Sequence, residues 1–157
     1  LARRRRAYGE DHPHVAWAEV DLAWLLHEQG RDADALPLLR GAVPKLRARL
    51  GEQHLYVSEA LQRLGAVLTE LWQFDEAQST LQEAVERFRT LPGHPVSGLC
   101  GCLGNLARLE WLRGQREAAV RTQSEVVATA AALPEVHFLR SVSETNLSYM
   151  VAELGDV

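Results

Sequence analysis

Hydrophobic residues recur three and four positions apart along most of the chain, which is the spacing of an amphipathic helix. Between residues 14 and 29 they fall at Val15, Ala18, Leu22, Leu25 and Leu26, which predicts a helix with one buried face. No stretch alternates polar and apolar residues for long, so no strand is expected. Together with the turn residues, this spacing predicts the end of a helix at 1–8 and helices over 14–29, 32–50, 55–71, 74–90, 96–113, 116–133 and 134–154. The sequence therefore predicts an all-α fold.

One stretch of this pattern returns at a fixed distance. The segment 21–30, DLAWLLHEQG, is followed 42 residues later by 63–72, RLGAVLTELW, and after a further 42 by 105–114, NLARLEWLRG. A fourth copy, 146–155, follows after 41 residues. A period of this size predicts stacked helical hairpins, each of which buries its apolar face against its neighbours. Trp72 stands where the other copies have glycine, so the turn there is expected to use a different backbone conformation.

The composition narrows the class of protein. Of the 157 residues, 46% are hydrophobic and 24% charged, as in a globular domain and unlike a disordered chain. The net charge of −4 gives no electrostatic reason to expect nucleic acid as a partner. No apolar stretch approaches the roughly 18 residues of a membrane span, so no membrane is expected either. Cys100 and Cys102 cannot form a disulfide framework and fit a reducing compartment, which favours a cytoplasmic location.

Residues that could carry chemistry form no recognisable catalytic or metal site. No phosphate-binding glycine loop, nucleophile turn or zinc-protease motif occurs, so no enzyme, cofactor or metal is predicted. His12 and His54 recur in equivalent turns, which favours a structural role, such as capping, over metal binding. The glycines Gly98, Gly101 and Gly104 are expected to allow close packing of a neighbouring helix, or else the approach of a partner's backbone.

Repeated helix pairs with small residues at fixed positions resemble the tetratricopeptide repeat. The residues that carry the resemblance are Leu22, Ala23, Gly30 and Ala35 in the first copy, Leu64, Gly65, Phe74, Ala77 and Ala84 in the second, and Leu106, Ala107, Gly114 and Ala119 in the third. The 42-residue period and the GEDHP turn at 9–13 are most similar to the kinesin-light-chain-like subgroup, which is common in large bacterial multidomain proteins. A bacterial source is therefore expected. The resemblance implies a right-handed α-α superhelix, that is, a solenoid of antiparallel helix hairpins.

The repeat pattern also gives the expected domain organisation. We expect a single array over 1–157 that is a piece of a longer chain. It is divided into the end of a preceding helix at 1–8, three repeats at 9–50, 51–91 and 92–133, and the first helix of a fourth repeat at 134–157.

The resemblance also implies where a partner binds. In this family the first helices of successive hairpins line a concave groove. The corresponding positions here are Trp17, Val20, Trp24, His27, Gln62, Thr69, Arg108, Trp111 and Tyr149. Large aromatic side chains at such positions suit the anchoring of a peptide, although Trp17 and Trp24 would also suit the core.

A non-catalytic module that binds a peptide or protein segment is therefore the predicted function. Two alternatives stay open. One is a regulatory or sensor segment of a signalling kinase, ATPase or protease that contacts its own neighbouring domains. The other is a homo-oligomer formed through the ends of the array. One ligand is excluded, because most of the donors that hold the carboxyl-terminal tail of chaperones in this family are replaced. The corresponding positions are Val20, Trp24, Arg63, Gly101 and Asn105.

Overall fold

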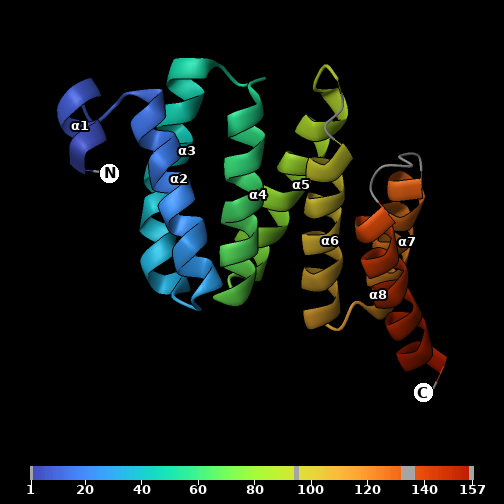
Figure 1. Cartoon of the computed structure of the whole chain (residues 1–157). Coiled ribbons are helices and arrows are strands. Elements are labelled where there is room, and N and C mark those ends of the chain that lie inside the picture. The colour runs from blue at the N-terminus through green and yellow to red at the C-terminus, as the bar shows by residue number, and fades with distance from the viewer. Residues whose placement is uncertain (1, 94–95, 132–136, 156–157) are drawn as a thin grey trace.

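The structure, a computed structural model, describes residues 2–93, 96–131 and 137–155, and every regular element in this part of the chain is a helix (Figure 1). The helices are α1 (Ala2–Tyr8), α2 (Pro13–Glu28), α3 (Asp32–Leu50), α4 (Leu55–Glu70), α5 (Phe74–Thr90), α6 (Val96–Leu112), α7 (Arg116–Ala131) and α8 (His137–Gly155). The all-α prediction is confirmed. Predicted boundaries agree to within one residue wherever the structure describes them, while the predicted ends at 133 and 134 lie outside the described residues.

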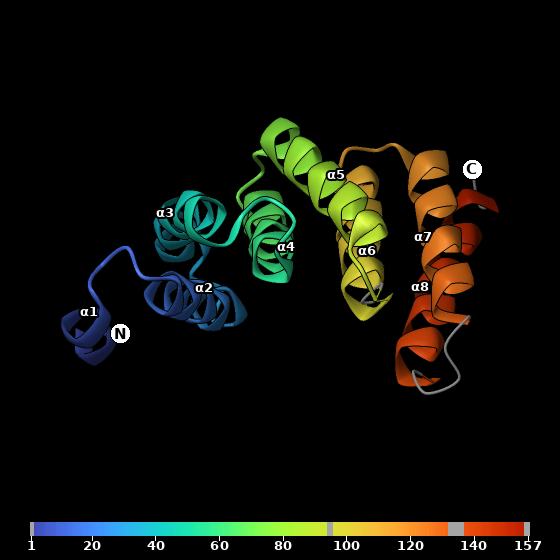
Figure 2. The ribbon, with the colours of Figure 1, turned by 90° about the horizontal axis from the view of Figure 1, so that it is seen from above.

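The helices pair as antiparallel hairpins that stack side by side. α2 packs on α3, α4 on α5 and α6 on α7, while α3 contacts α4, α5 contacts α6 and α7 contacts α8. Seen from above, the first helices of the hairpins and α8 follow an arc, and α3, α5 and α7 lie on its outer side (Figure 2). Because α4 also contacts both α2 and α6, the first helices form a continuous inner surface. The architecture is the right-handed superhelix of hairpins expected from the sequence.

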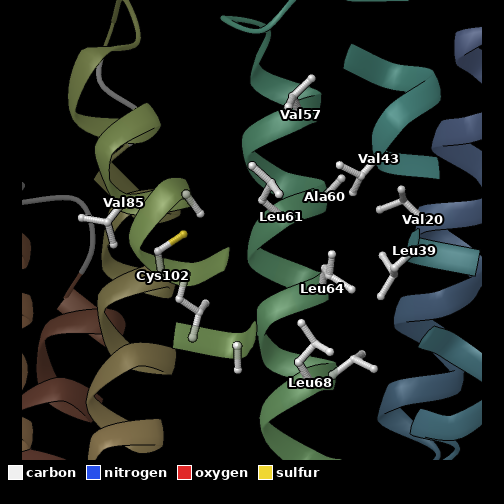
Figure 3. Close-up of a cluster of buried hydrophobic side chains, with 14 of the residues drawn as sticks. Val20, Leu39, Val43, Val57, Ala60, Leu61, Leu64, Leu68, Val85 and Cys102 are labelled. Atoms are coloured by element: carbon white, nitrogen blue, oxygen red, sulfur yellow. The ribbon is translucent and has the colours of Figure 1, made fainter. Parts of the chain in front are cut away.

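Apolar side chains fill the space between successive hairpins. Val20, Leu39 and Val43 of the first hairpin face Ala60 and Leu64 of α4 (Figure 3). All five side chains are at most 7% exposed. Burying one Val or Leu side chain contributes about 1.5–3 kcal/mol, so this interface is what holds neighbouring repeats together.

The hydrophobic spacing of α2 predicts one buried face, but other helices cover this face only in part. Leu22 and Leu25 are 37% and 54% exposed. Their counterparts one repeat later, Leu64 and Val67, are 7% and 0% exposed. In α4 these positions meet the hairpin before it, whereas the only described element before α2 is the short helix α1. The spacing locates the helix, but the neighbouring helices decide which apolar side chains are buried.

The turns inside the three hairpins share one backbone conformation. Gly30 has φ 71°, Gly114 has φ 77° and Trp72 has φ 60°. In all three turns the next backbone N–H donates to the carbonyl five residues before it, at 2.9 Å. The prediction of a different conformation at Trp72 is therefore wrong, because this hydrogen bond requires a left-handed residue whatever its side chain. For a residue other than glycine this conformation costs about 1–2 kcal/mol.

The recurring histidines cap helices, as the sequence predicted. The Nδ1 atom of His12 accepts a hydrogen bond from the backbone N–H of His14 at 3.2 Å, at the start of α2. The Nδ1 atom of His54 accepts one from the N–H of Tyr56 at 3.1 Å, at the start of α4. Each imidazole satisfies a backbone donor that has no partner within the helix.

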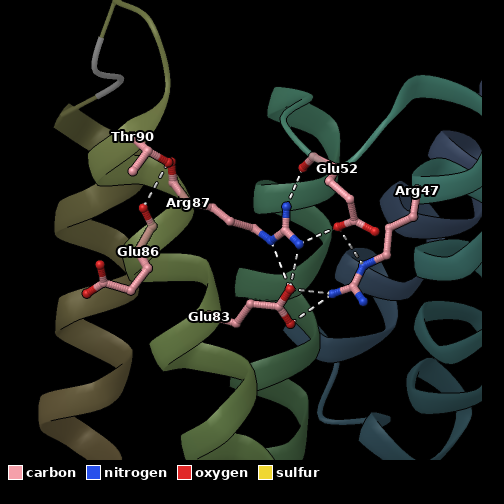
Figure 4. A network of polar contacts seen from close by, with 6 residues as sticks. All are labelled: Arg47, Glu52, Glu83, Glu86, Arg87 and Thr90. Atoms are coloured by element: carbon pink, nitrogen blue, oxygen red, sulfur yellow. Dashed lines mark hydrogen bonds and ion pairs between the residues drawn. The ribbon is translucent and has the colours of Figure 1, made fainter.

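Ion pairs join the second helices of neighbouring hairpins on the outer side. Glu83 of α5 accepts hydrogen bonds from Arg47 of α3 at 2.7 and 2.8 Å, and from Arg87 of its own helix at 2.9 Å (Figure 4). Arg87 also pairs with Glu52 in the connection between α3 and α4. Burial would raise the pKa of Glu83, but the two arginines outweigh it and hold this pKa below its ordinary value of 4.5. The network joins α5 to the preceding repeat.

Candidate functional site

The inner surface between α2 and α4 gathers aromatic rings around one arginine. The ring of Trp17 stacks on Tyr56 with centroids 4.2 Å apart and an angle of 18° between the planes. The guanidinium of Arg63 lies 5.1 Å from the ring centroid of Trp17 and 5.6 Å from that of Trp24. It also pairs with Asp21 at 3.0 Å. Both tryptophans are half-buried, so one part of each ring packs within the chain and another part stays open to a ligand.

Beside this cluster lies a hollow of about 260 Å³, lined by Trp24, Glu59, Gln62 and Arg63. It offers an aromatic ring, a carboxyl group, an amide and a guanidinium within one small space. Burial raises the pKa of Glu59 above its ordinary value, although the nearby Arg63 opposes the shift. The hollow therefore has the mixed apolar and polar lining that suits a side chain of a bound peptide.

The next helix along the inner surface, α6, presents glycines to its neighbours. A Cβ atom on Gly98 would lie 2.3 Å from the ring of Phe88 in α5, and one on Gly101 would lie 2.2 Å from the amide nitrogen of Gln62 in α4. Close packing is therefore confirmed at these two positions. A Cβ on Gly104 would meet nothing within 4 Å, so this part of the helix surface is open.

The far end of the inner surface again combines aromatic and charged side chains. Arg108 of α6 pairs with Glu70 of α4. The ring of Trp111 has Arg116 at 3.8 Å on its face and Tyr149 of α8 at a centroid distance of 6.2 Å. Tyr149 is 60% exposed. An apolar and aromatic platform is thus available at both ends of the inner surface.

Seven of the nine predicted groove residues keep accessible surface on these first helices and on α8. They are Trp17, Trp24, His27, Gln62, Arg108, Trp111 and Tyr149. The prediction is wrong for the other two, Val20 and Thr69, because their side chains are 0% and 2% exposed. Val20 belongs to the core between α2, α3 and α4, and the hydroxyl of Thr69 donates to the Gly65 carbonyl at 2.8 Å. Neither can reach a ligand while the helices are packed. That the other seven residues bind a partner stays a prediction.

The predicted set omitted Tyr56 and Arg63, which the structure places at the centre of the aromatic cluster. A signal for Arg63 exists in the sequence. It lies 42 residues after Asp21, so opposite charges occupy the same position in successive repeats, and such positions face each other across adjacent first helices. Tyr56 carries no such signal, because its counterpart one repeat earlier is His14.

The described residues contain no group of three or more His, Cys, Asp or Glu side chains placed to hold a metal ion. Cys100 and Cys102 are both buried, and burial raises the pKa of both thiols, which makes them poor nucleophiles. None of the described helices is both long and apolar enough to span a membrane.

Comparison with known proteins agrees with this geometry. Residues 1–48 match the family model of the tetratricopeptide repeat. The chain superposes over 92% of its length on the nearly identical TPR-like repeats of a candidate kinesin light chain from Podosopora anserina, with a TM-score of 0.78 and 26% identity, and covers 69% of that chain. A variant of the same repeats gives a TM-score of 0.77 at 25% identity, with 92% of this chain and 68% of that one covered.

BtubC (BKLC) from P. vanneervenii has the same fold, with a TM-score of 0.81 at 21% identity. The match covers 92% of this chain and 59% of BtubC, so the chain spans about three-fifths of that relative. No curated protein matches the sequence significantly. The fold is a solenoid of stacked helix hairpins. By these matches the chain is similar, over residues 1–48, to the tetratricopeptide repeat and, over 92% of its length, to the kinesin-light-chain-like kind of these repeats.

Proposed function

We propose that the chain binds an extended peptide or protein segment along the inner surface formed by α2, α4, α6 and α8. The observation that carries the proposal is the cluster in which Trp17 and Trp24 flank Arg63 beside an open hollow. Tetratricopeptide repeats generally mediate contacts between proteins, which supports the same conclusion.

The chemistry of the cluster suits a peptide better than a small metabolite. A half-buried tryptophan offers a large apolar face with little loss of conformational freedom on binding, and such residues dominate the binding energy of interfaces. The hollow of about 260 Å³ is below the size of an ordinary small-molecule pocket. It has room for one side chain, while the rest of a ligand would extend over the open surface at Gly104 toward Trp111.

Two arginines of this surface are already paired inside the chain. Arg63 pairs with Asp21, and Arg108 pairs with Glu70. A ligand that brought its own charges would exchange partners with these pairs, so we expect the charged groups to select the ligand and the rings to provide most of the affinity.

Selection of peptides from a displayed random library, with the wild-type chain as target, would test the proposal. Selected peptides are then compared by calorimetry on wild type, Trp24→Ala and Leu25→Ala. Trp24→Ala should weaken binding about 30-fold, which corresponds to about 2 kcal/mol for an aromatic anchor. Leu25→Ala is the matched control, because Leu25 is a large exposed side chain of the same helix outside the cluster.

Equal affinity of all three proteins for the selected peptides would contradict the proposal and move the binding surface elsewhere. Circular dichroism of Trp24→Ala separates this result from unfolding. If the variant loses its helical signal, Trp24 serves the core and the anchoring role assigned to it is wrong.

A further inference from the structure

Trp72 occupies a hairpin turn in which most of its side chain is exposed to solvent. It has φ 60°, a conformation that the equivalent turns give to Gly30 and Gly114. Its side chain is 69% exposed. The contact it makes with another ring is to Phe74, at a centroid distance of 5.3 Å. A strained backbone whose side chain is left in solvent points to a role outside the packing of the fold.

The other three tryptophans of the chain each lie against an arginine. Arg63 lies over both Trp17 and Trp24, and Arg116 lies 3.8 Å from the ring centroid of Trp111. Among the described residues no arginine or lysine lies over Trp72 in this way. The attraction between a guanidinium and an indole face is general, so the exposed face of Trp72 is suited to receive a cation from outside the chain.

The charges around Trp72 favour the same kind of partner. The second helices of the hairpins all begin at the edge of the array that carries the hairpin turns, and their first turns are acidic. These acids are Asp32, Asp34, Asp75, Glu76 and Glu117. The last turns of α3 and α5, at the opposite edge, carry Arg47, Arg49, Arg87 and Arg89 instead. The acids offset the helix dipoles, and four of them pair within the chain: Asp32 with His27, Asp34 with Arg31, Asp75 with Arg113 and Glu76 with Arg40. Of these four, Asp75 has the most exposed side chain, so its carboxylate is the one best placed to accept a further contact from a basic partner.

Asp75 is the exposed carboxylate that lies nearest to the ring pair along the chain. It lies directly after Phe74, its side chain is 95% exposed, and its pairing with Arg113 at 3.0 Å leaves the rest of the carboxylate open to solvent. A carboxylate oxygen accepts more than one hydrogen bond, so Asp75 can also hold an incoming guanidinium. Ring and carboxylate together offer the two contacts that arginine makes best.

We propose that Trp72, Phe74 and Asp75, here called the Trp72 edge, form a second docking site that receives an arginine side chain from a basic segment of a protein partner. This site goes beyond the proposed groove function, since it lies on the hairpin turns and not on the inner surface. A chain that uses both surfaces would hold two partners, or two parts of one partner, at the same time.

Nuclear magnetic resonance of ¹⁵N-labelled protein tests the proposal with a defined probe. The probe is a capped peptide of alternating arginine and glycine, and the control is the same peptide with citrulline, which has nearly the same shape and no charge. The indole N–H signal of Trp72 is identified by its loss in Trp72→Gly. The arginine peptide should shift this signal, and the citrulline peptide should leave it in place. An equal response to both peptides would overturn the proposal.

Two variants sharpen the test. Trp72→Gly should weaken the arginine peptide about tenfold, within the range of a cation–π contact. Asp75→Asn should weaken it severalfold, more strongly at low salt than at high salt. Shifts at Trp17 and Trp24 in place of Trp72 would mean that the peptide binds in the groove, and the Trp72 edge would be rejected.

Two further measurements decide whether Trp72 has this role. Chemical unfolding should show Trp72→Gly to be at least as stable as wild type, since glycine suits the left-handed turn. A clear loss of stability would make Trp72 a structural residue and overturn the proposal. A Trp72 signal that moves with protein concentration, without any peptide, would make a second copy of the chain the occupant and overturn it as well.

Discussion

At the scale of single residues, the three glycines of α6 have different surroundings although they lie within about two turns of one helix. Gly98 lies under the ring of Phe88, Gly101 under the amide of Gln62, and Gly104 faces open space. Phe88 is 1% exposed and cannot move aside without disturbing the core, whereas the amide of Gln62 is the end of a flexible side chain. The cost of adding a methyl group therefore differs among the three positions.

Gly98→Ala should lower the free energy of unfolding by about 1–3 kcal/mol, because the new methyl group would overpack against Phe88. Gly104→Ala is the matched control in the same helix, and it should raise the free energy of unfolding by up to about 1 kcal/mol, the gain from helix propensity. Urea unfolding of both variants measures the two effects. Equal effects of the same sign would mean that the contact with Phe88 does not determine how an added methyl group at position 98 changes stability.

The histidine caps lead to a second prediction at this scale. His54→Ala should cost about 1 kcal/mol, since the N–H of Tyr56 loses its acceptor. His54→Asn should retain most of the stability, because an asparagine oxygen also accepts from the second or third residue of a helix. Thermal unfolding distinguishes the two. If both variants melt like wild type, the hydrogen bond to His54 contributes nothing measurable.

At the scale of elements, the pairing between α3 and α5 is the feature that the sequence did not reveal. Arg40 pairs with Glu76 at 2.6 Å and Arg47 with Glu83 at 2.7 Å, and in both cases the partner lies 36 residues further along the chain. This offset is shorter than the 42-residue period, because the contacts join different positions of neighbouring repeats. A search for charges at equal repeat positions finds Asp21 and Arg63 but misses these pairs.

The lowered pKa of Glu83 makes this network depend on pH in a definite direction. A carboxyl group whose folded pKa lies below its unfolded value stabilises the fold above that unfolded value, and the contribution is lost as the pH falls through the folded pKa. Glu83→Gln should therefore cost about 1 kcal/mol at neutral pH, a modest amount because the side chain is 38% exposed. The difference from wild type should vanish in acid. Urea unfolding at several pH values tests this, and a constant difference would contradict it.

The helices and the positions of the turns could be predicted because their signals are local, whereas the backbone conformation at Trp72 was predicted wrongly. Hydrophobic spacing and turn residues located the helix ends to within one residue, apart from the two that lie outside the described residues, and the fixed period gave the stacking of hairpins. Which side of a helix is covered depends on its neighbours. This explains why Leu25 is exposed although its counterpart Val67 is buried, and why Val20 and Thr69 are buried although equivalent family positions line the groove.

At the scale of the whole molecule, burial is greatest in the middle of the array and declines toward α8. α4 buries ten residues and α7 buries four, while among the described side chains of α8 only that of Ser143 is buried. In an array of repeats, local stability follows the contacts of each unit with its neighbours. Hydrogen exchange should therefore be slowest for the amides of α4 and α5 and fastest for those of the terminal helices α1 and α8. Uniform protection along the chain would instead show that the array unfolds as one cooperative unit.

The contacts between successive hairpins also have a mechanical consequence. Each hairpin of the described chain packs mainly against the hairpins next to it. Ion pairs such as that of Arg47 with Glu83 cross the interface between two hairpins, here called a joint. A small rotation at one joint leaves the packing inside each hairpin intact, and rotations at successive joints add up along the array. The stiffness of the whole array is thus set by the apolar contacts and ion pairs between hairpins, and a displacement of its ends is shared among several of these interfaces.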